Sequence, residues 1–129
     1  MSPQQRRLLE MAGRAIESAR RSIVADDAAT AANRAYYAML YAAQAALAGE
    51  NVDVRSHGAV HAAFGARFAK TARLEPRLHR WLLDASDLRL LADYDPMWTL
   101  EAVSIQETVD QAGHMIATIE QFLEPQDEG

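Results

Sequence analysis

The sequence contains no cysteine. Disulfide bonds, thiolate nucleophiles and cysteine-ligated metal centres are therefore excluded. Long hydrophobic runs are also missing, because polar residues interrupt every apolar stretch well before the ~20 residues that a membrane span needs. The opening segment, MSPQQRRLLEMAGR, lacks the apolar core of a signal peptide. We therefore expect a cytoplasmic protein with no membrane association.

Proline is scarce, and its four positions are informative because proline is tolerated at a helix start but disrupts a helix interior. The prolines are Pro3, Pro76, Pro96 and Pro125. We expect each to lie at the end of an element. Half of the 129 residues are hydrophobic, which excludes a disordered chain. The sequence predicts one domain over residues 1–124 and a frayed tail over residues 125–129.

Apolar residues recur at spacings of three and four in five segments, which predicts five helices and no strand. The expected helices span residues 3–24, 27–49, 57–71, 76–94 and 99–123. The second is apolar on most sides, as is typical of a central helix with several neighbours. Asp27 and Ser56 are expected N-caps, and Gly49 is an expected C-cap. Five helices with short connections predict an all-α, up-and-down antiparallel bundle.

The net charge of −5 conceals an uneven distribution of charge. Residues 55–89 contain six arginines and one lysine against three acids, whereas residues 99–129 contain seven acids and no basic residue. Arginine accounts for twelve of the thirteen basic residues, and its planar fork suits phosphate. Two interpretations stay open: solvated helix faces, or a basic groove for phosphate, RNA or an acidic partner.

Three tyrosines on the expected second helix form an unusual group for an alanine-rich segment. Tyr37 and Tyr41 are one turn apart and share a face with Asn33, whereas Tyr36 is expected to point elsewhere. These rings either pack in the core or an interface, or form a polar-aromatic wall on which bases can stack.

Two pairs of residues at helical i, i+4 spacing have the residue types of a functional site. His57 and His61 have a spacing that two metal ligands can use, but no third ligand accompanies them. We therefore expect hydrogen bonding by His57 at the helix start, no metal site and no cofactor. Arg89 and Asp93 are expected to form an ion pair, unless the acids that precede Pro96 serve a functional site.

Three motifs together resemble the small prokaryotic HEPN-domain family (higher eukaryotes and prokaryotes nucleotide-binding). They are Asn33-Arg34-Ala35-Tyr36-Tyr37-Ala38-Met39, then Ser56-His57-Gly58 with Val60 and Phe64, then Arg89-Leu90-Leu91-Ala92-Asp93-Tyr94, which matches "R-x-x-A-D-Y". They occur in the family's order, and the similarity covers roughly residues 5–123. The resemblance implies a five-helix bundle. It also implies a homodimer with a cleft at the subunit interface, and often a minimal nucleotidyltransferase as the antitoxin of a toxin–antitoxin pair.

Ribonuclease members of the family carry an R-x(4–6)-H motif and cleave RNA without a metal. Arg89 matches the arginine of that motif, but Tyr94 stands at the position of the histidine. A histidine pKa of about 6.5 suits a general base at neutral pH, whereas a tyrosine pKa of about 10 does not. Two other segments, from Arg55 to His61 and from Arg73 to His79, fit the spacing at other positions.

The resemblance favours a nucleotide- or RNA-binding module that pairs with a nucleotidyltransferase. Arg89, Asp93 and Tyr94 are its candidate catalytic residues, and Tyr94 is also a candidate for modification by the partner. Candidate binding residues are Asn33, Tyr37, Tyr41, Arg55 and His57. Two alternatives stay open: a metal-independent RNA-cleaving toxin that uses Arg89 with Asp93, Tyr94 or a histidine brought close by folding, such as His57, and a non-catalytic helical dimer.

Overall fold

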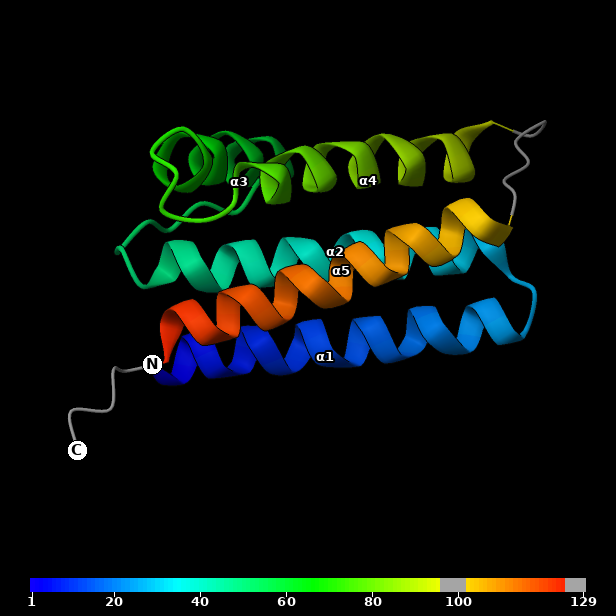
Figure 1. The fold of residues 1–129 in the computed structure, drawn as a ribbon, viewed down its shortest axis with the longest axis horizontal. Coiled ribbons are helices and arrows are strands. Elements are labelled where there is room, and N and C mark those ends of the chain that lie inside the picture. Colours follow the sequence, from blue (N-terminus) through cyan, green and yellow to red (C-terminus); the bar gives the residue numbers. More distant parts are fainter. Residues whose placement is uncertain (96–101, 125–129) are drawn as a thin grey trace.

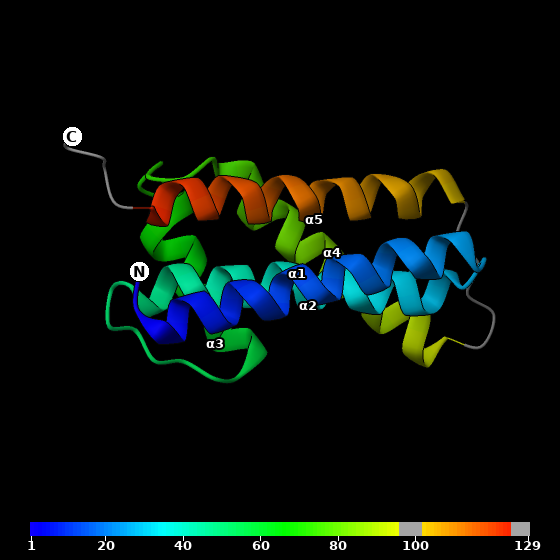
Figure 2. The ribbon, with the colours of Figure 1, turned by 90° about the horizontal axis from the view of Figure 1, so that it is seen from below.

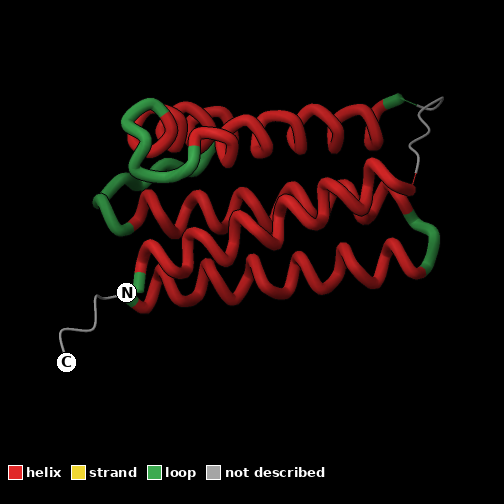
Figure 3. The backbone as a smooth tube through the Cα atoms, in the orientation of Figure 1, coloured by secondary structure: helices red, strands yellow, loops and turns green. Residues whose placement is uncertain are grey.

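The structure, a computed structural model, describes residues 1–95 and 102–124, and its elements are all helical (Figure 1). They are α1 (Pro3–Val24), α2 (Ala28–Ala48), α3 (His57–Phe64), the π-helix η1 (Gly65–Ala69), α4 (Pro76–Tyr94) and α5 (Ala102–Leu123). The four long helices alternate in direction, and α3 with η1 lies beside α4 at one end of the bundle (Figure 3). The predicted all-α, five-helix antiparallel bundle is confirmed.

Helix α2 lies at the centre of the bundle, as its apolar sequence predicts. It packs against α1, α5, α4 and α3, and Figure 2 shows α1 following it along most of its length. Eight of its buried residues are alanines, whose small side chains let neighbouring helices approach closely. Tyr36 is a large, fully buried side chain in the middle of this helix. Any polar group that Tyr36 contributes is therefore in the protein interior.

Side-chain caps start the first three helices. Ser2 and Gln5 form a reciprocal capping box at α1, in which Ser2 Oγ accepts from the Gln5 amide at 3.1 Å. Asp27 caps α2 and Ser56 caps α3, so both predicted N-caps are confirmed. Gly49 caps the end of α2 in a right-handed conformation, and a Cβ atom there would lie 2.5 Å from Nε2 of Gln5.

The third segment differs from the continuous α-helix expected over residues 57–71. Its α-helical part ends at Phe64, and η1 follows with a bond of 2.8 Å from the Lys70 amide to the Gly65 carbonyl, five residues back. This turn contacts α4, and a Cβ atom built on Gly65 would lie 2.6 Å from Nε2 of His79. A single π-turn inside a helix often accompanies a functional site.

Helix α4 ends as predicted, because Asp95 has an extended backbone conformation (φ −103°, ψ 107°) before a proline. The expected start of the last helix, at residues 99–101, lies outside the described residues. So does the expected frayed tail, residues 125–129. From Ala102 to Leu123 the last helix agrees with its predicted range.

Candidate functional site

A buried tyrosine hydroxyl on α2 connects two histidines of α3. The Tyr36 hydroxyl lies 3.1 Å from Nδ1 of His57 and 2.8 Å from Nε2 of His61. Both imidazoles approach because Ser56 starts α3 immediately before His57, which places the two histidines one turn apart on the face toward α2. The Tyr36 hydroxyl also has a hydrogen bond with the buried Ser86 of α4. Three helices therefore meet at one phenol oxygen.

Arg89 of α4 covers the tyrosine pair. Its Cζ atom lies 4.8 Å from the ring centre of Tyr36 and 5.8 Å from that of Tyr37, both within cation–π distance. Its Nε is buried and has no hydrogen-bond acceptor among the residues that the structure describes. A buried, unpaired donor on a cation is costly and is satisfied by an anionic oxygen. We call Tyr36, Tyr37, His57, His61 and Arg89 the Tyr36 cluster.

The Tyr36 cluster continues along α2 as an aromatic surface. The Tyr37 ring meets the His57 ring edge-on at 5.6 Å and the Tyr41 ring at 5.9 Å. Arg34 adds a second guanidinium 5.6 Å from the Tyr37 ring centre. Tyr37 and Tyr41 are partly exposed, whereas Tyr36 is fully buried. The cluster thus has a buried hydroxyl at Tyr36, and next to it lie the partly exposed rings of Tyr37 and Tyr41 and the positive charge of Arg34.

The protonation states in the cluster follow from burial and from the nearby cations. Burial raises the pKa of Tyr36, against the opposing effects of its Ser86 hydrogen bond and the Arg89 charge, so the phenol is neutral at neutral pH. Burial, followed by the Arg89 charge, lowers the pKa of His57. The pKa of His61 is lowered by burial and then by the charges of His57, His79 and Arg89, and is raised by Asp87. Both imidazoles are therefore neutral at neutral pH.

The predicted site residues divide into those that the fold brings together and those that it does not. Arg89, Tyr37 and His57 meet in the Tyr36 cluster, and Tyr41 adjoins it. Arg55 is exposed in the preceding loop, where its Nε lies 3.7 Å from Asp53.

Asn33 is partly exposed and lies one turn before Tyr37 on α2. Asp93 and Tyr94 are exposed at the end of α4, and Tyr94 retains 77% of its accessible surface. Because five residues of an α-helix rotate by about 140°, Tyr94 points away from the face that carries Arg89. Among the described residues no ion pair joins Arg89 to Asp93, so that expectation is wrong.

Two members of the cluster, Tyr36 and His61, are not among the site residues that the sequence predicts. The helical spacing predicts that Tyr36 points away from the face shared by Tyr37 and Tyr41. In the structure its hydroxyl makes the hydrogen bonds that connect α2 to His57 and His61 of α3. The sequence offers His61 as one of a pair of metal ligands and as a histidine at ribonuclease-motif spacing from Arg55, but not as a partner of Tyr36. The sequence does contain a signal for this contact. A buried tyrosine hydroxyl needs a hydrogen-bond partner, and a histidine pair at i, i+4 offers two ring nitrogens on one helix face. In residues 1–95 and 102–124 no three potential metal ligands gather, and no helix has the length and hydropathy to cross a bilayer.

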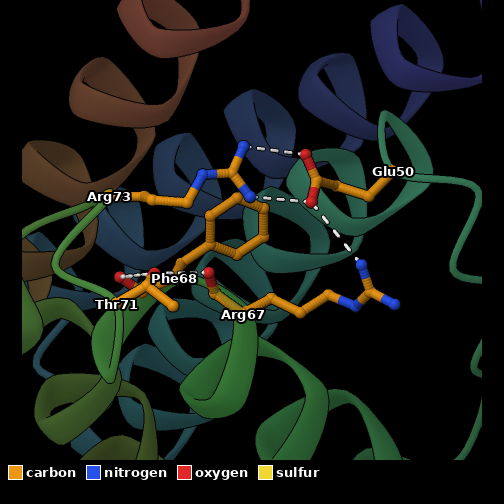
Figure 4. Close-up of polar contacts among 5 residues, drawn as sticks. All are labelled: Glu50, Arg67, Phe68, Thr71 and Arg73. Carbon is orange, nitrogen blue, oxygen red and sulfur yellow. Dashed lines mark hydrogen bonds and ion pairs between the residues drawn. The ribbon is translucent and has the colours of Figure 1, made fainter.

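Two arginines of the middle segment, Arg67 and Arg73, form a separate cluster around Glu50, just after the C-terminal end of α2 (Figure 4). Both terminal nitrogens of Arg73 donate to the Glu50 carboxylate, at 2.7 and 2.8 Å, and Arg67 lies 3.6 Å from the same group. The Arg73 guanidinium also covers the Phe68 ring at 5.0 Å. These hydrogen bonds lower the pKa of Glu50. Arg77 is similarly paired with Glu75. The geometry favours charge pairing over an open basic groove in this part of the segment.

Comparisons with known proteins point to one family. A family model described as "HEPN domain" matches residues 5–128. The UPF0332 protein glr0978 of Gloeobacter violaceus is 40% identical over 96 residues, which cover 73% of this chain and 75% of that protein. A UPF0332 protein of Thermotoga maritima is 27% identical over 74% of this chain and 72% of its own length. A Methanocaldococcus jannaschii protein named "Putative toxin MJ0142" is 29% identical over 69% of this chain and 60% of its own length.

Proposed function

The chain belongs to the HEPN family, and from this premise we propose that the Tyr36 cluster binds the phosphate group of a nucleotide or RNA. We further propose that the protein acts with a nucleotidyltransferase partner in a toxin–antitoxin-like pair. The toxin name of the Methanocaldococcus relative supports a function of this kind. The observation that carries the proposal is Arg89, a cation stacked on two tyrosine rings with a buried Nε that lacks an acceptor. A phosphate oxygen supplies that acceptor.

The aromatic surface next to Arg89 supports a nucleotide as the ligand. Tyr37 and Tyr41 present partly exposed rings on which a base can stack, at about 1–3 kcal/mol per base. Arg34, whose guanidinium lies over the Tyr37 ring, supplies a second positive charge for the phosphate backbone of an RNA strand. Asn33, one turn before Tyr37, offers an amide for a base edge. Arg55 is a further contact within this proposal, on the loop that leads into α3.

We propose a homodimer formed through the outer face of α4. Leu83, Leu90, Leu91 and Tyr94 on this helix retain between 38% and 77% of their accessible surface. Leu90, Leu91 and Tyr94 line an open hollow of about 670 Å³ together with Asp87 and Asp95. A second copy of the chain would cover this apolar face. In the protomer, before a second copy covers this face, the Tyr94 hydroxyl is exposed at the helix end and accessible for modification by the nucleotidyltransferase.

RNA cleavage is a second candidate function, and the position of His57 supports it. The family motif places a histidine after Arg89, where this chain has Tyr94, but folding brings His57 of α3 to the same cluster as Arg89. A neutral imidazole is the residue type that removes a 2′-hydroxyl proton at neutral pH. Asp93 lies on the Arg89 face of α4 and is the alternative proton acceptor.

The proposal is tested with the variant Arg89→Ala and the matched control Arg80→Ala, which removes an exposed arginine from the same helix. Arg89→Ala is expected to weaken binding of a fluorescent single-stranded RNA at least tenfold and to abolish any growth arrest on expression, whereas Arg80→Ala leaves both unchanged. Gel analysis of the same RNA after incubation with the protein distinguishes cleavage, which shortens the RNA, from binding, which leaves it intact. Equal loss in both variants, or no RNA or nucleotide binding by the wild type, would leave only a structural helical dimer.

A further inference from the structure

The Tyr36 hydroxyl imposes a rule on the two histidines that share it. A neutral phenol has one proton, so it donates one hydrogen bond and accepts others. It cannot donate to both His57 Nδ1 and His61 Nε2. When both imidazoles are neutral and both bonds are made, Tyr36 either donates to one histidine and accepts from the other, or accepts from both and donates to Ser86. The tautomers of His57 and His61 are coupled in the first of these arrangements.

The two distances indicate which histidine donates. Bonds donated by a hydroxyl are typically shorter, about 2.7–2.8 Å, than bonds donated by a ring or amide N–H, about 2.9–3.0 Å. The contact of Tyr36 with His61 is 2.8 Å and that with His57 is 3.1 Å. The shorter contact fits a bond that Tyr36 donates to Nε2 of His61, and the longer contact fits a bond that Tyr36 accepts from Nδ1 of His57. In this arrangement the other ring nitrogen of His57, Nε2, has no proton.

We propose that Tyr36 is a positioning residue that holds the proton of His57 on Nδ1, so that Nε2 of His57 is the hydrogen-bond and proton acceptor of the site beside Arg89. This inference rests on the proposed function in one respect, namely that a ribonucleotide is the ligand. Arg89 then holds a phosphate oxygen while Nε2 of His57 accepts from a ribose hydroxyl. His61 fixes the hydroxyl of Tyr36 and does not meet the ligand.

The groups around the two imidazoles favour this arrangement. From α4, Arg89 and His79 face them with positive or ionisable nitrogen, and Asp87 provides an opposing negative charge that acts on His61. From α2, Tyr37 meets the His57 ring with its own ring. His79 Nε2 donates to the His61 carbonyl at 3.1 Å and holds the backbone of α3 in place. A neutral imidazole has one acceptor nitrogen, and Tyr36 determines which nitrogen that is.

Nitrogen NMR of histidine-labelled protein tests the inference without any RNA. In the wild type at neutral pH, His57 is expected to show a protonated Nδ1 and an unprotonated Nε2, and His61 the same pattern. In Tyr36→Phe, the His57 pattern is expected to move toward the mixture of tautomers of a free imidazole. The control Tyr37→Phe removes a neighbouring phenol hydroxyl that has no hydrogen bond among the described residues, and it is expected to keep the wild-type His57 pattern.

A protonated Nε2 on His57 in the wild type overturns the inference, and this result needs no variant. An unchanged His57 spectrum in folded Tyr36→Phe, verified by circular dichroism, overturns it as well. The proposed function fails separately, because RNA binding is measured on other samples. The expected tautomer together with no RNA binding refutes the proposed function but leaves the role of Tyr36 intact. RNA binding together with a protonated Nε2 on His57 refutes the role of Tyr36 but leaves the proposed function intact.

Discussion

Gly65 tests whether the contact between η1 and α4 is as tight as the structure shows. A Cβ atom at this position would lie 2.6 Å from Nε2 and 2.7 Å from Cε1 of His79, well inside van der Waals contact. The imidazole cannot move outward without lengthening its 3.1 Å bond to the His61 carbonyl. Gly65→Ala is therefore expected to overpack this contact, although its backbone conformation (φ −60°) is one that alanine adopts readily.

The magnitude follows from two opposing effects. Overpacking typically costs about 1–3 kcal/mol. Replacing a helical glycine with alanine recovers about 0.5–1 kcal/mol of backbone entropy. The net loss in the free energy of unfolding is expected to be about 1–2 kcal/mol for Gly65→Ala. Gly13 in α1 is the matched control, because a Cβ atom there meets nothing within 4 Å. Gly13→Ala is expected to stabilise the protein by about 0.5–1 kcal/mol.

Urea unfolding followed by circular dichroism measures both variants on one scale. With a slope of about 1–3 kcal/mol per molar urea, Gly65→Ala is expected to lower the midpoint by about 1 M, and Gly13→Ala to raise it by a few tenths. Because the two variants are expected to shift the midpoint in opposite directions, a general stabilising effect of replacing glycine with alanine cannot account for both results. If Gly65→Ala raises the midpoint as Gly13→Ala does, then His79 does not pack against Gly65, and the reasoning on the α3–α4 contact is refuted.

Three further predictions concern stability. Ser2→Ala removes the α1 capping-box acceptor and is expected to cost about 1 kcal/mol in urea unfolding, and no loss would show that the cap is not formed in solution. Glu50 has a lowered pKa, so its pairing with Arg73 stabilises the fold above the unfolded pKa and is lost as the pH falls through the folded pKa. The deficit of Glu50→Gln at neutral pH is thus expected to vanish in acid, and a pH-independent deficit contradicts this. Since His57 and His61 have lowered pKa values, the unfolded chain binds more protons between their folded values and about 6.5. The free energy of unfolding is therefore expected to fall as the pH decreases through that window. The fall is expected to be less steep in His57→Gln than in the wild type, and an equal slope in the two would contradict this prediction.

The elements of the fold could be predicted because their signals are local. The caps at Asp27 and Ser56, the end of α4 before Pro96 and the apolar sides of α2 depend on residues within one or two turns of each other. The π-turn at Gly65 could not be predicted in this way. It coincides with a contact to His79, which is fourteen residues further along the chain and reaches Gly65 only when α4 packs against η1.

The candidate site shows the same division. Residue types and helical spacing drew notice to Arg89, Tyr37 and His57 one at a time, and the resemblance to the HEPN family selected them as candidate site residues. Periodicity also indicates that Tyr36 is buried. Tertiary packing alone decided that the Tyr36 hydroxyl meets two imidazoles, 21 and 25 residues away in the sequence. A hydrogen bond needs positions accurate to a few tenths of an ångström, and only three helices packed together provide that accuracy.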